Sequence, residues 1–241
     1  FLAVFLFFPP LPAFAELRNG MDADIVIGQP DFFSSLTLTS QSNLNSPFGV
    51  TTDGRRLIIS DGTNNRVLIF QTIPRTSFAP ADIVLGQTDF TSSTAGSGID
   101  KITSPDKIHT DGKRLFCSDF NNHRVLIWNT IPTANGAPAN VVIGQPDFST
   151  ITSGTTPDKM NNPTGVFSDG KRLLVADREN HRVLIWNTIP TSNGVTADII
   201  LGESGVAGGG PTMLDSPSDV YFDGKKLFVA DRNNNRILIW N

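Results

Sequence analysis

One unit recurs four times along this chain, and a repeat at near-constant spacing restricts the fold more than any other feature. The segment at 23–29 returns in steps of 58 residues, at 81–87, 139–145 and 197–203. A second shared segment reads Asp-x-x-Asn-x-Arg and precedes four apolar residues. It begins at Asp61, Asp119, Asp177 and Asp231. These segments divide residues 16–241 into repeats near 23–80, 81–138, 139–196 and 197–241.

Each repeat contains four short apolar runs bounded by turn residues. In the second repeat these runs are 108–110, 114–118, 124–128 and 141–144. They are rich in Val, Ile, Leu and aromatic residues, which favour β-strands. Asp111-Gly112 predicts a tight hairpin between the first two runs. No stretch after Ala15 shows sustained helical periodicity, so we expect an all-β fold.

Four antiparallel strands repeated at this spacing predict a β-propeller. One such sheet cannot bury both of its faces, whereas stacked blades can. We name the strands of each blade a, b, c and d, with d at the Ile-Val-Ile-Gly run. The chain then holds four blades, as a closed ring or as a fragment of a six-bladed propeller. In the closed ring, the d run at 25–28 would complete the blade that the last a, b and c strands form.

The first fifteen residues differ from the rest of the chain. Residues 1–8 are apolar without interruption, and Ala13-Phe14-Ala15 follows three prolines. This pattern predicts a truncated signal peptide at 1–15, cleaved after Ala15. The run is too short to span a bilayer. We therefore expect a secreted or periplasmic protein of the cell envelope without a transmembrane segment in its mature chain.

Composition removes several function classes. The formal net charge is −4, which argues against a nucleic-acid-binding protein. Cys117 is the single cysteine, so an intrachain disulfide cannot form. We interpret it as a small buried side chain, because sibling repeats carry Ile59, Val175 and Val229 at its place. The sequence lacks a phosphate-binding loop and zinc-type spacing, so no cofactor is predicted.

Two segments resemble the NHL repeat, at 119–128 and 177–186, as does the Pro-x-Gly-Val…Asp-Gly…Leu-x-Val-Ala-Asp pattern of 163–177. The resemblance extends over the chain after Asn19. It implies a propeller, usually of six blades in this family. Relatives bind protein or RNA, and a few are metal-dependent lyases or hydrolases. This chain departs from the pattern in its longer repeats and in Asn65 and Asn235, which replace the motif histidine.

The repeated charged residues predict structure rather than catalysis. An active site needs one set of groups, and here one set occurs four times. We expect a salt bridge across each b–c turn, from Asp61 to Arg66, Asp119 to Arg124, Asp177 to Arg182 and Asp231 to Arg236. The asparagine between them would complete the turn. His123 and His181 occupy the same turn in adjacent blades and are interpreted as turn residues.

Basic pairs occupy the a–b hairpins, at 55–56, 113–114, 171–172 and 225–226. In an up-and-down blade these hairpins share one face of the propeller. Solvated turns explain such pairs, and attraction to an anionic glycan or an envelope surface is the functional alternative.

Residues that break the symmetry of strand a are the candidate site, because strand a lines the channel of a propeller. Asp106, His109, Asp219 and Tyr221 differ from their equivalents in the other repeats. Carboxylates and an imidazole at a channel mouth could act as acid and base, and Asp106, His109 and Asp219 could hold Ca²⁺ or Zn²⁺.

These observations predict a binding or scaffold module for a protein, glycan or envelope partner. The alternative is a metal-assisted lyase or hydrolase at the channel mouth, and a third reading is a purely structural ring. An open arc would expose an apolar blade face, so two copies could close a ring as a dimer.

Overall fold

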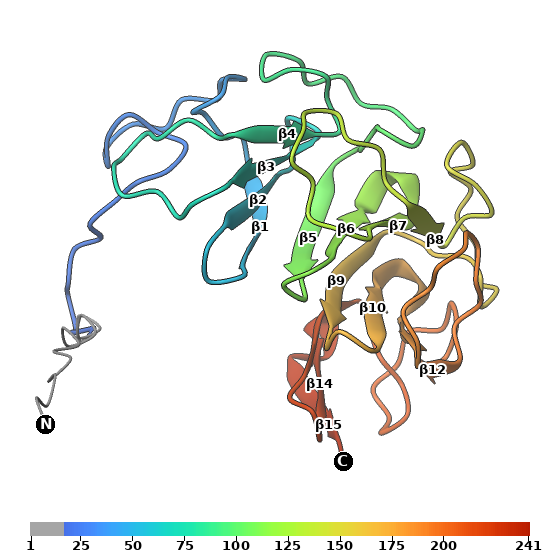
Figure 1. Ribbon diagram of the computed structural model, residues 1–241. Coiled ribbons are helices and arrows are strands. Elements are labelled where there is room, and N and C mark those ends of the chain that lie inside the picture. The colour runs from blue at the N-terminus through green and yellow to red at the C-terminus, as the bar shows by residue number, and fades with distance from the viewer. Residues whose placement is uncertain (1–16) are drawn as a thin grey trace, which may run out of the picture.

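The computed structural model describes residues 17–241, which form four antiparallel sheets arranged around an arc (Figure 1). The first sheet contains β1 (Pro47–Thr52), β2 (Leu57–Asp61), β3 (Arg66–Phe70) and β4 (Ile83–Leu85). The second contains β5 (Pro105–Thr110), β6 (Leu115–Asp119), β7 (Arg124–Trp128) and β8 (Val141–Ile143). The third contains β9 (Pro163–Ser168), β10 (Leu173–Asp177), β11 (Arg182–Trp186) and β12 (Ile199–Gly202). The fourth contains β13 (Pro217–Phe222), β14 (Leu227–Asp231) and β15 (Arg236–Trp240).

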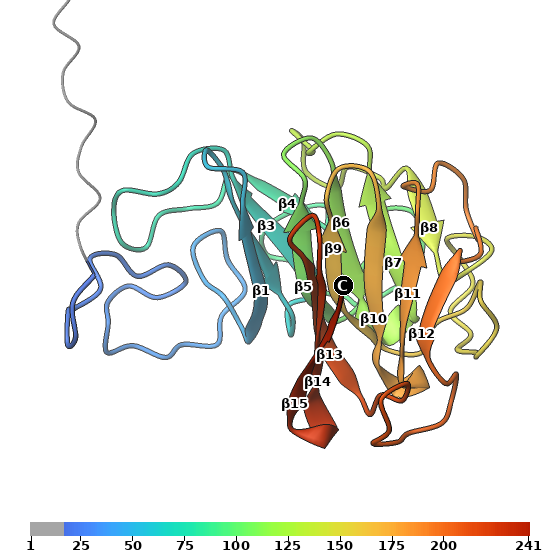
Figure 2. The ribbon, with the colours of Figure 1, turned by 90° about the horizontal axis from the view of Figure 1, so that it is seen from below.

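Strands that are neighbours in the sequence pair with one another in every sheet, so each sheet is an up-and-down blade. Figure 2 shows the blades side by side, with β1, β5, β9 and β13 on the inner side of the arc. The prediction of an all-β propeller architecture with four blades is confirmed. Short 3₁₀ turns, η1 (Phe120–Asn122), η2 (Arg178–Asn180) and η3 (Arg232–Asn234), join strands b and c in the last three blades.

Apolar side chains fill the space between successive blades. Ile58 and Ile69 of the first blade belong to one buried cluster with Cys117 and Leu126 of the second. The same arrangement joins the second blade to the third and the third to the fourth. Both faces of an inner blade are therefore buried. This explains why strand β7 is apolar at every position from 125 to 128. Cys117 is buried, and this burial raises the pKa of its thiol. Both observations agree with its interpretation as a small packing residue.

The a–b hairpins close as the Asp-Gly signal predicts. The Oδ1 of Asp111 accepts hydrogen bonds from the backbone N–H groups of Lys113 and Arg114, at 2.9 and 2.6 Å. Gly112 has a φ of +86°, a conformation that a side chain would strain. The same turn recurs in all four blades, because each carries Asp-Gly at this place.

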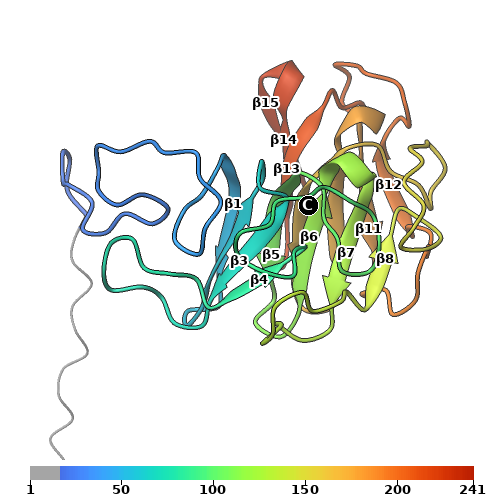
Figure 3. The same ribbon diagram turned by 90° about the horizontal axis from the view of Figure 1, so that it is seen from above.

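Of the two alternatives for the four blades, the structure of residues 17–241 describes an open arc rather than a closed ring. The fourth sheet has three strands, and residues 25–28 do not pair with β15. Instead, the carbonyl of Val26 accepts a hydrogen bond from the N–H of Phe78 at 2.9 Å, and the Val26 N–H donates to the Ser77 hydroxyl at 3.2 Å. These bonds hold the segment against the first blade. The first and last blades are the two ends of an open arc (Figure 3).

The predicted signal peptide at 1–15 lies outside the described residues. Among the helices described for residues 17–241, none has the length and apolar character needed to cross a membrane.

Candidate functional site

The repeated aspartate and arginine form an ion pair in every blade. The arginine Nε lies 2.6–2.7 Å from the aspartate Oδ2, in the pairs Asp61–Arg66, Asp119–Arg124, Asp177–Arg182 and Asp231–Arg236. In the first three blades both side chains are fully buried. The pair spans the b–c turn because the aspartate ends strand b and the arginine begins strand c.

Each pair also organises the polar loops around it. Asn122 donates to Asp119 Oδ2 at 2.9 Å, and the backbone N–H of Thr103 donates to Oδ1 at 2.7 Å. Arg124 donates to the carbonyls of Gly98 and Lys101, at 3.0 and 2.9 Å. Every donor and acceptor of the pair thus has a protein partner, and the loop between strands d and a is fixed by it. Aspartate and arginine side chains that are hydrogen-bonded within the protein in this way are not available to bind a substrate.

The histidines of the b–c turns hold the next blade. His123 has a φ of +53° and His181 a φ of +55°, a left-handed conformation that Asn65 also adopts, at +51°. The Nδ1 of His123 accepts a hydrogen bond from the backbone N–H of Asn162 at 3.1 Å. Asn65 Oδ1 accepts the corresponding bond from Ser104 at 2.8 Å. Asn and His are exchangeable here because both tolerate this backbone and present an acceptor at the same place.

The basic a–b hairpins are partly neutralised. Arg56 lies 2.7 Å from Asp53, and Arg114 lies 3.0 Å from Asp111. The third hairpin has the same pair, at 3.5 Å. In the second hairpin, Arg114 is paired and Lys113 remains as the exposed positive charge. In the fourth hairpin Lys225 and Lys226 are both exposed, and no ion pair is described for either within residues 17–241. The face therefore presents fewer free charges than the ring of eight that the sequence suggested.

Three of the four symmetry-breaking residues of strand a, His109, Asp219 and Tyr221, lie together on the concave face of the arc. The ring centroids of His109 and Phe167 are 4.8 Å apart, and those of Phe167 and Tyr221 are 5.1 Å apart. Phe228 of β14 extends the row, 6.2 Å from Tyr221. Equivalent positions of adjacent blades are neighbours on this face, so one aromatic ring from each of three blades gives a continuous aromatic surface.

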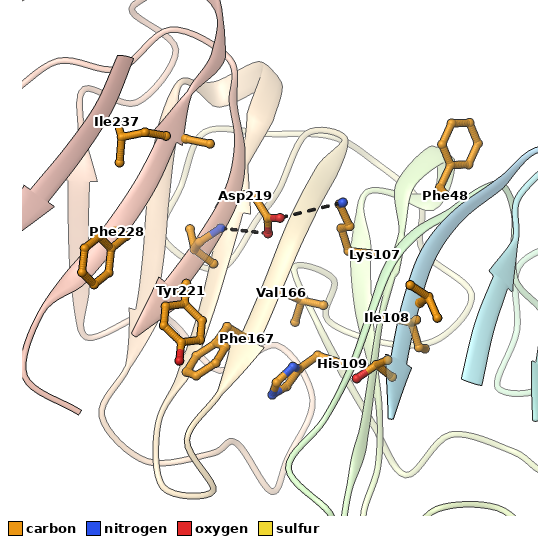
Figure 4. Close-up of a pocket in the computed structure, with 14 residues that line it drawn as sticks. Phe48, Lys107, Ile108, His109, Val166, Phe167, Asp219, Tyr221, Phe228 and Ile237 are labelled. Atoms are coloured by element: carbon orange, nitrogen blue, oxygen red, sulfur yellow. Dashed lines mark hydrogen bonds and ion pairs between the residues drawn. The ribbon is translucent and has the colours of Figure 1, made fainter. Parts of the chain in front are cut away.

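This surface lines a pocket of about 410 Å³ (Figure 4). Apolar side chains of the first and last blades complete its walls, among them Phe48, Val50 and Ile237. Figure 4 shows Lys107 and Asp219 pointing toward each other across it, with 3.8 Å between the Lys107 Nζ and the Asp219 Oδ2. The pocket is therefore mainly apolar, with one exposed ion pair at its rim.

His109 is fixed within the pocket. Its Nε2 donates a hydrogen bond to the carbonyl of Ser168 at 2.9 Å, which leaves Nδ1 as an acceptor. Burial lowers the pKa of the His109 imidazole, and the bond to Ser168 opposes that effect. The side chain is consequently neutral at pH 7, because its pKa lies below the usual value of about 6.5. A neutral imidazole can accept a proton or a hydrogen bond from a ligand.

Asp106 lies at the opposite end of strand a and lines a different pocket, of about 390 Å³, with Asp219, Lys107, Arg178 and Arg232. Burial raises the pKa of Asp106, and Lys107 opposes that rise. Asp219 belongs to both pockets and His109 only to the first. Within residues 17–241, no three His, Cys, Asp or Glu side chains are grouped closely enough to hold a metal ion.

Sequence reasoning identified His109, Asp219 and Tyr221 of the aromatic pocket but missed Phe228 and Ile237. Phe228 is opposite Tyr221 in the β13–β14 register, and Ile237 is opposite Ala230. Both lie on strands b and c, whose counterparts in inner blades are covered by the following blade. Only the end position of the fourth blade brings them to the pocket, and no local pattern could show this.

Comparison with known proteins supports the repeat assignment. Residues 160–186 match the family model described as NHL repeat. No curated protein matches the chain significantly.

Several solved structures are similar to this chain at low sequence identity. An auxiliary nutrient binding protein from Bacteroides ovatus has a TM-score of 0.53 and 10% identity, covering 84% of this chain and 50% of that one. A chain of a nidogen/laminin complex has a TM-score of 0.49 and 20% identity, covering 82% and 60%. A putative 6-phosphogluconolactonase from Bacteroides uniformis has a TM-score of 0.48 and 19% identity, covering 81% and 50%. This chain thus spans between 50% and 60% of the length of these three.

Proposed function

We propose that this chain is an exported NHL-like propeller that acts as a binding or scaffold module, with a protein, glycan or envelope partner held in the aromatic pocket of its concave face. The observation that carries the proposal is the row formed by His109, Phe167, Tyr221 and Phe228, since the repeat itself does not require such a row.

The composition of the pocket favours binding. Ligand sites are concave and mostly apolar, with a few polar groups that orient the ligand. Tyr221 is 54% exposed and Phe48 is 53% exposed, although both have large apolar surfaces. Exposed aromatic surface of this kind marks interaction sites in soluble proteins, and tyrosine is enriched among the residues that dominate binding energy.

The polar groups of the pocket could orient such a partner. His109 Nδ1 offers an acceptor, and Lys107 and Asp219 offer a donor and an acceptor at the rim. The ion pair between the last two is exposed, so exchanging it for bonds to a ligand costs little free energy. A protein loop with an apolar side chain, or a sugar with an apolar face, meets these requirements.

The experiment that tests the proposal places a photo-crosslinking phenylalanine analogue at position 221 of the full chain. The matched control carries the same residue at position 151, where Ile151 is 46% exposed on a loop outside the pocket. After irradiation in envelope extract, the crosslinked molecule is identified by mass spectrometry, purified and titrated with the unmodified protein.

We expect one product specific to position 221, and a loss of at least about tenfold in affinity for Tyr221→Ala. Tyr221→Phe should retain most of the affinity if the ring supplies the contact. Equal labelling at both positions, or unchanged affinity of Tyr221→Ala, would refute a partner site in this pocket.

Export is part of the same proposal and is tested separately. The apolar run at 1–8 and the Ala-x-Ala sequence at 13–15 support it. The mature protein should begin at Glu16, which N-terminal sequencing of the envelope fraction would detect. An uncleaved chain in the cytoplasmic fraction would contradict export but would leave the pocket proposal in place.

A metal-assisted lyase or hydrolase is the second candidate, and the raised pKa of Asp106 in a pocket with three cationic side chains favours it. A carboxyl group that stays protonated to higher pH can act as a general acid. Elemental analysis after dialysis against metal-free buffer should then find one equivalent of Ca²⁺ or Zn²⁺. Asp106 and Asp219 line the same pocket, so they are the carboxylates that could hold it, and replacing both by Ala should remove the ion. Retention of the ion by the double variant would exclude these residues as its ligands.

A further inference from the structure

Two arginines that the repeat does not require line one pocket beside the first residues of the strands a. Arg178 and Arg232 follow the repeated aspartate of the third and fourth blades, where the first two blades carry Gly62 and Phe120. The b–c turn therefore forms without a cation at this place. Both arginines line the pocket of about 390 Å³, and Lys107 of β5 is its third cation.

The guanidinium groups of the two arginines lack acceptors within the protein. Glu179 Oε1 lies 3.4 Å from Arg178 Nε but does not accept a hydrogen bond from it, and this nitrogen is buried without a partner in residues 17–241. No hydrogen bond or ion pair is described for the Arg232 side chain in the same range. Arg182 of the same turn, by contrast, donates to an aspartate and to loop carbonyls. Buried donors are normally paired, so a group outside the protein is the missing acceptor.

Two carboxylates share the pocket and leave the arginines free. Asp219 Oδ2 lies 3.8 Å from Lys107 Nζ, and in the described part of the chain no ion pair joins either arginine to Asp106 or Asp219. Three cations and two carboxylates give the pocket a formal charge of +1. One negative charge on a ligand therefore balances it, while the two carboxylates remain as hydrogen-bond acceptors.

The pocket does not depend on the ends of the arc. Its lining residues belong to the second, third and fourth blades. The Thr164 hydroxyl donates to the Pro217 carbonyl at 3.2 Å, which joins the third blade to the fourth at this pocket. The Arg178 side chain is 27% exposed although a further blade follows its own. A position of this kind thus stays accessible from the concave side when the next blade is in place.

We propose that this pocket binds a sugar acid, a molecule with several hydroxyl groups and one carboxylate. Arg178 and Arg232 hold the carboxylate, because the planar guanidinium group offers paired N–H donors that match two carboxylate oxygens. The hydroxyl groups of the ligand donate to the carboxylates of Asp106 and Asp219, which accept but cannot donate.

The mixture of charges selects this class of ligand. Sulfate satisfies the arginines but is repelled by the two carboxylates and offers them no donor. A neutral sugar satisfies the carboxylates but leaves two guanidinium groups without a charged acceptor. A sugar acid meets both requirements, as electrostatic complementarity demands. The proposal does not rest on a partner in the aromatic pocket, since Asp106, Arg178 and Arg232 line only the second pocket.

Isothermal titration calorimetry of the purified full chain tests the ligand class. The probes are galacturonate, its trimer and the methyl-esterified trimer, in buffer that contains a chelator. We expect saturable binding of the trimer and a loss of about tenfold or more for the ester, because the ester removes the charge that the arginines recognise. The monomer should bind as tightly as the trimer if the ligand is a free sugar acid, and more weakly if it is a polysaccharide.

Three outcomes of this titration overturn the proposal. Absence of saturable binding of both acids would refute the site. Equal affinity for the ester would exclude recognition of the carboxylate. Binding that appears only after Ca²⁺ replaces the chelator would mean that a metal ion, rather than the guanidinium groups, holds the ligand.

Replacing the arginines tests which residues bind. Arg178→Ala and Arg232→Ala should each weaken binding of the trimer by about tenfold or more. Neither change should disturb the turn, since Gly62 and Phe120 occupy this place in other blades. Arg75→Ala is the matched control, because Arg75 is an exposed arginine of the first blade outside this pocket. Unchanged affinity of both pocket variants, or an equal loss for the control, would contradict the assignment.

Asp106→Ala separates a sugar acid from any other anion. No hydrogen bond is described for the Asp106 carboxylate in residues 17–241, so the substitution should leave the blade intact. Removing this negative charge strengthens the binding of an anion that has no contact with it. For a sugar acid, binding should instead weaken, because a hydroxyl group loses its acceptor. Tighter binding of the trimer to Asp106→Ala would overturn the sugar-acid assignment and indicate a site for an inorganic anion or an acidic peptide.

Discussion

The Nε of Arg124 lies 2.6 Å from the Oδ2 of Asp119, and neither side chain is exposed to solvent. Removing one partner of such a pair leaves a buried charge without compensation. We expect Arg124→Ala to lower the free energy of unfolding by about 3–5 kcal/mol. Arg114→Ala is the control in the same blade, because its pair with Asp111 is partly exposed and contributes about 0–1 kcal/mol. Urea unfolding of the two variants measures the difference, and equal losses would contradict the structural role.

His123 can be replaced by asparagine without loss of stability. Asn65 already forms the corresponding bond at a φ of +51°, so His123→Asn retains both the acceptor and the backbone conformation. His123→Ala removes the acceptor for Asn162 and strains a left-handed residue, which should cost about 1–3 kcal/mol. Thermal unfolding of both variants is the measurement. A large loss for His123→Asn would mean that the imidazole has a further role.

The stability of the protein relative to His123→Asn should depend on pH. Burial lowers the pKa of His123, so the unfolded chain binds a proton at this site more readily than the folded chain does. Stability from this group is therefore complete above the unfolded pKa of about 6.5 and falls as the pH drops below it.

Urea unfolding of both proteins between pH 8 and pH 5 tests this sign. The stability difference should shift in favour of His123→Asn as the pH falls. A constant difference, or one of opposite sign, would contradict a neutral His123 that accepts the Asn162 bond.

Gly165 lies where two neighbouring strands a approach closely. A Cβ atom there would lie 2.6 Å from the Asp219 Cα and 2.9 Å from the Val220 N. Gly165→Ala should therefore separate β9 from β13, lowering the free energy of unfolding by about 1–3 kcal/mol. Gly96→Ala is the control, since its nearest contact would be the flexible Lys101 side chain at 3.5 Å. Hydrogen exchange of β13 should increase for Gly165→Ala only.

The sequence predicted the strands more accurately than it predicted the site. Strand c of the second blade was expected at 124–128 and is found there, because a short apolar run between turn residues has little freedom. The aromatic row was predicted only in part. His109 and Tyr221 stood out by breaking the repeat, whereas Phe228 resembles an ordinary core residue of strand b.

The sequence by itself determined the strands of the blade, the four copies of it in this chain, and the turn and ion pair that recur in each copy. Local turn chemistry at Asp111-Gly112 and the alternation of apolar runs specify each sheet without reference to the rest of the molecule. The buried Asp119–Arg124 pair follows from the same repetition. An aspartate that recurs in every b–c turn, always with an arginine five residues later, is expected to pair with that arginine.

Only the tertiary structure decided what lies at the ends. Val26 and Val84 have nearly the same sequence surroundings, yet Val84 pairs with β3, whereas Val26 belongs to none of the sheets described for residues 17–241. Ile237 and Val67 are likewise equivalent in sequence, but one is exposed and the other is buried. The reason is physical: burial depends on which blade comes next, and that neighbour is a property of the assembled arc rather than of any local segment.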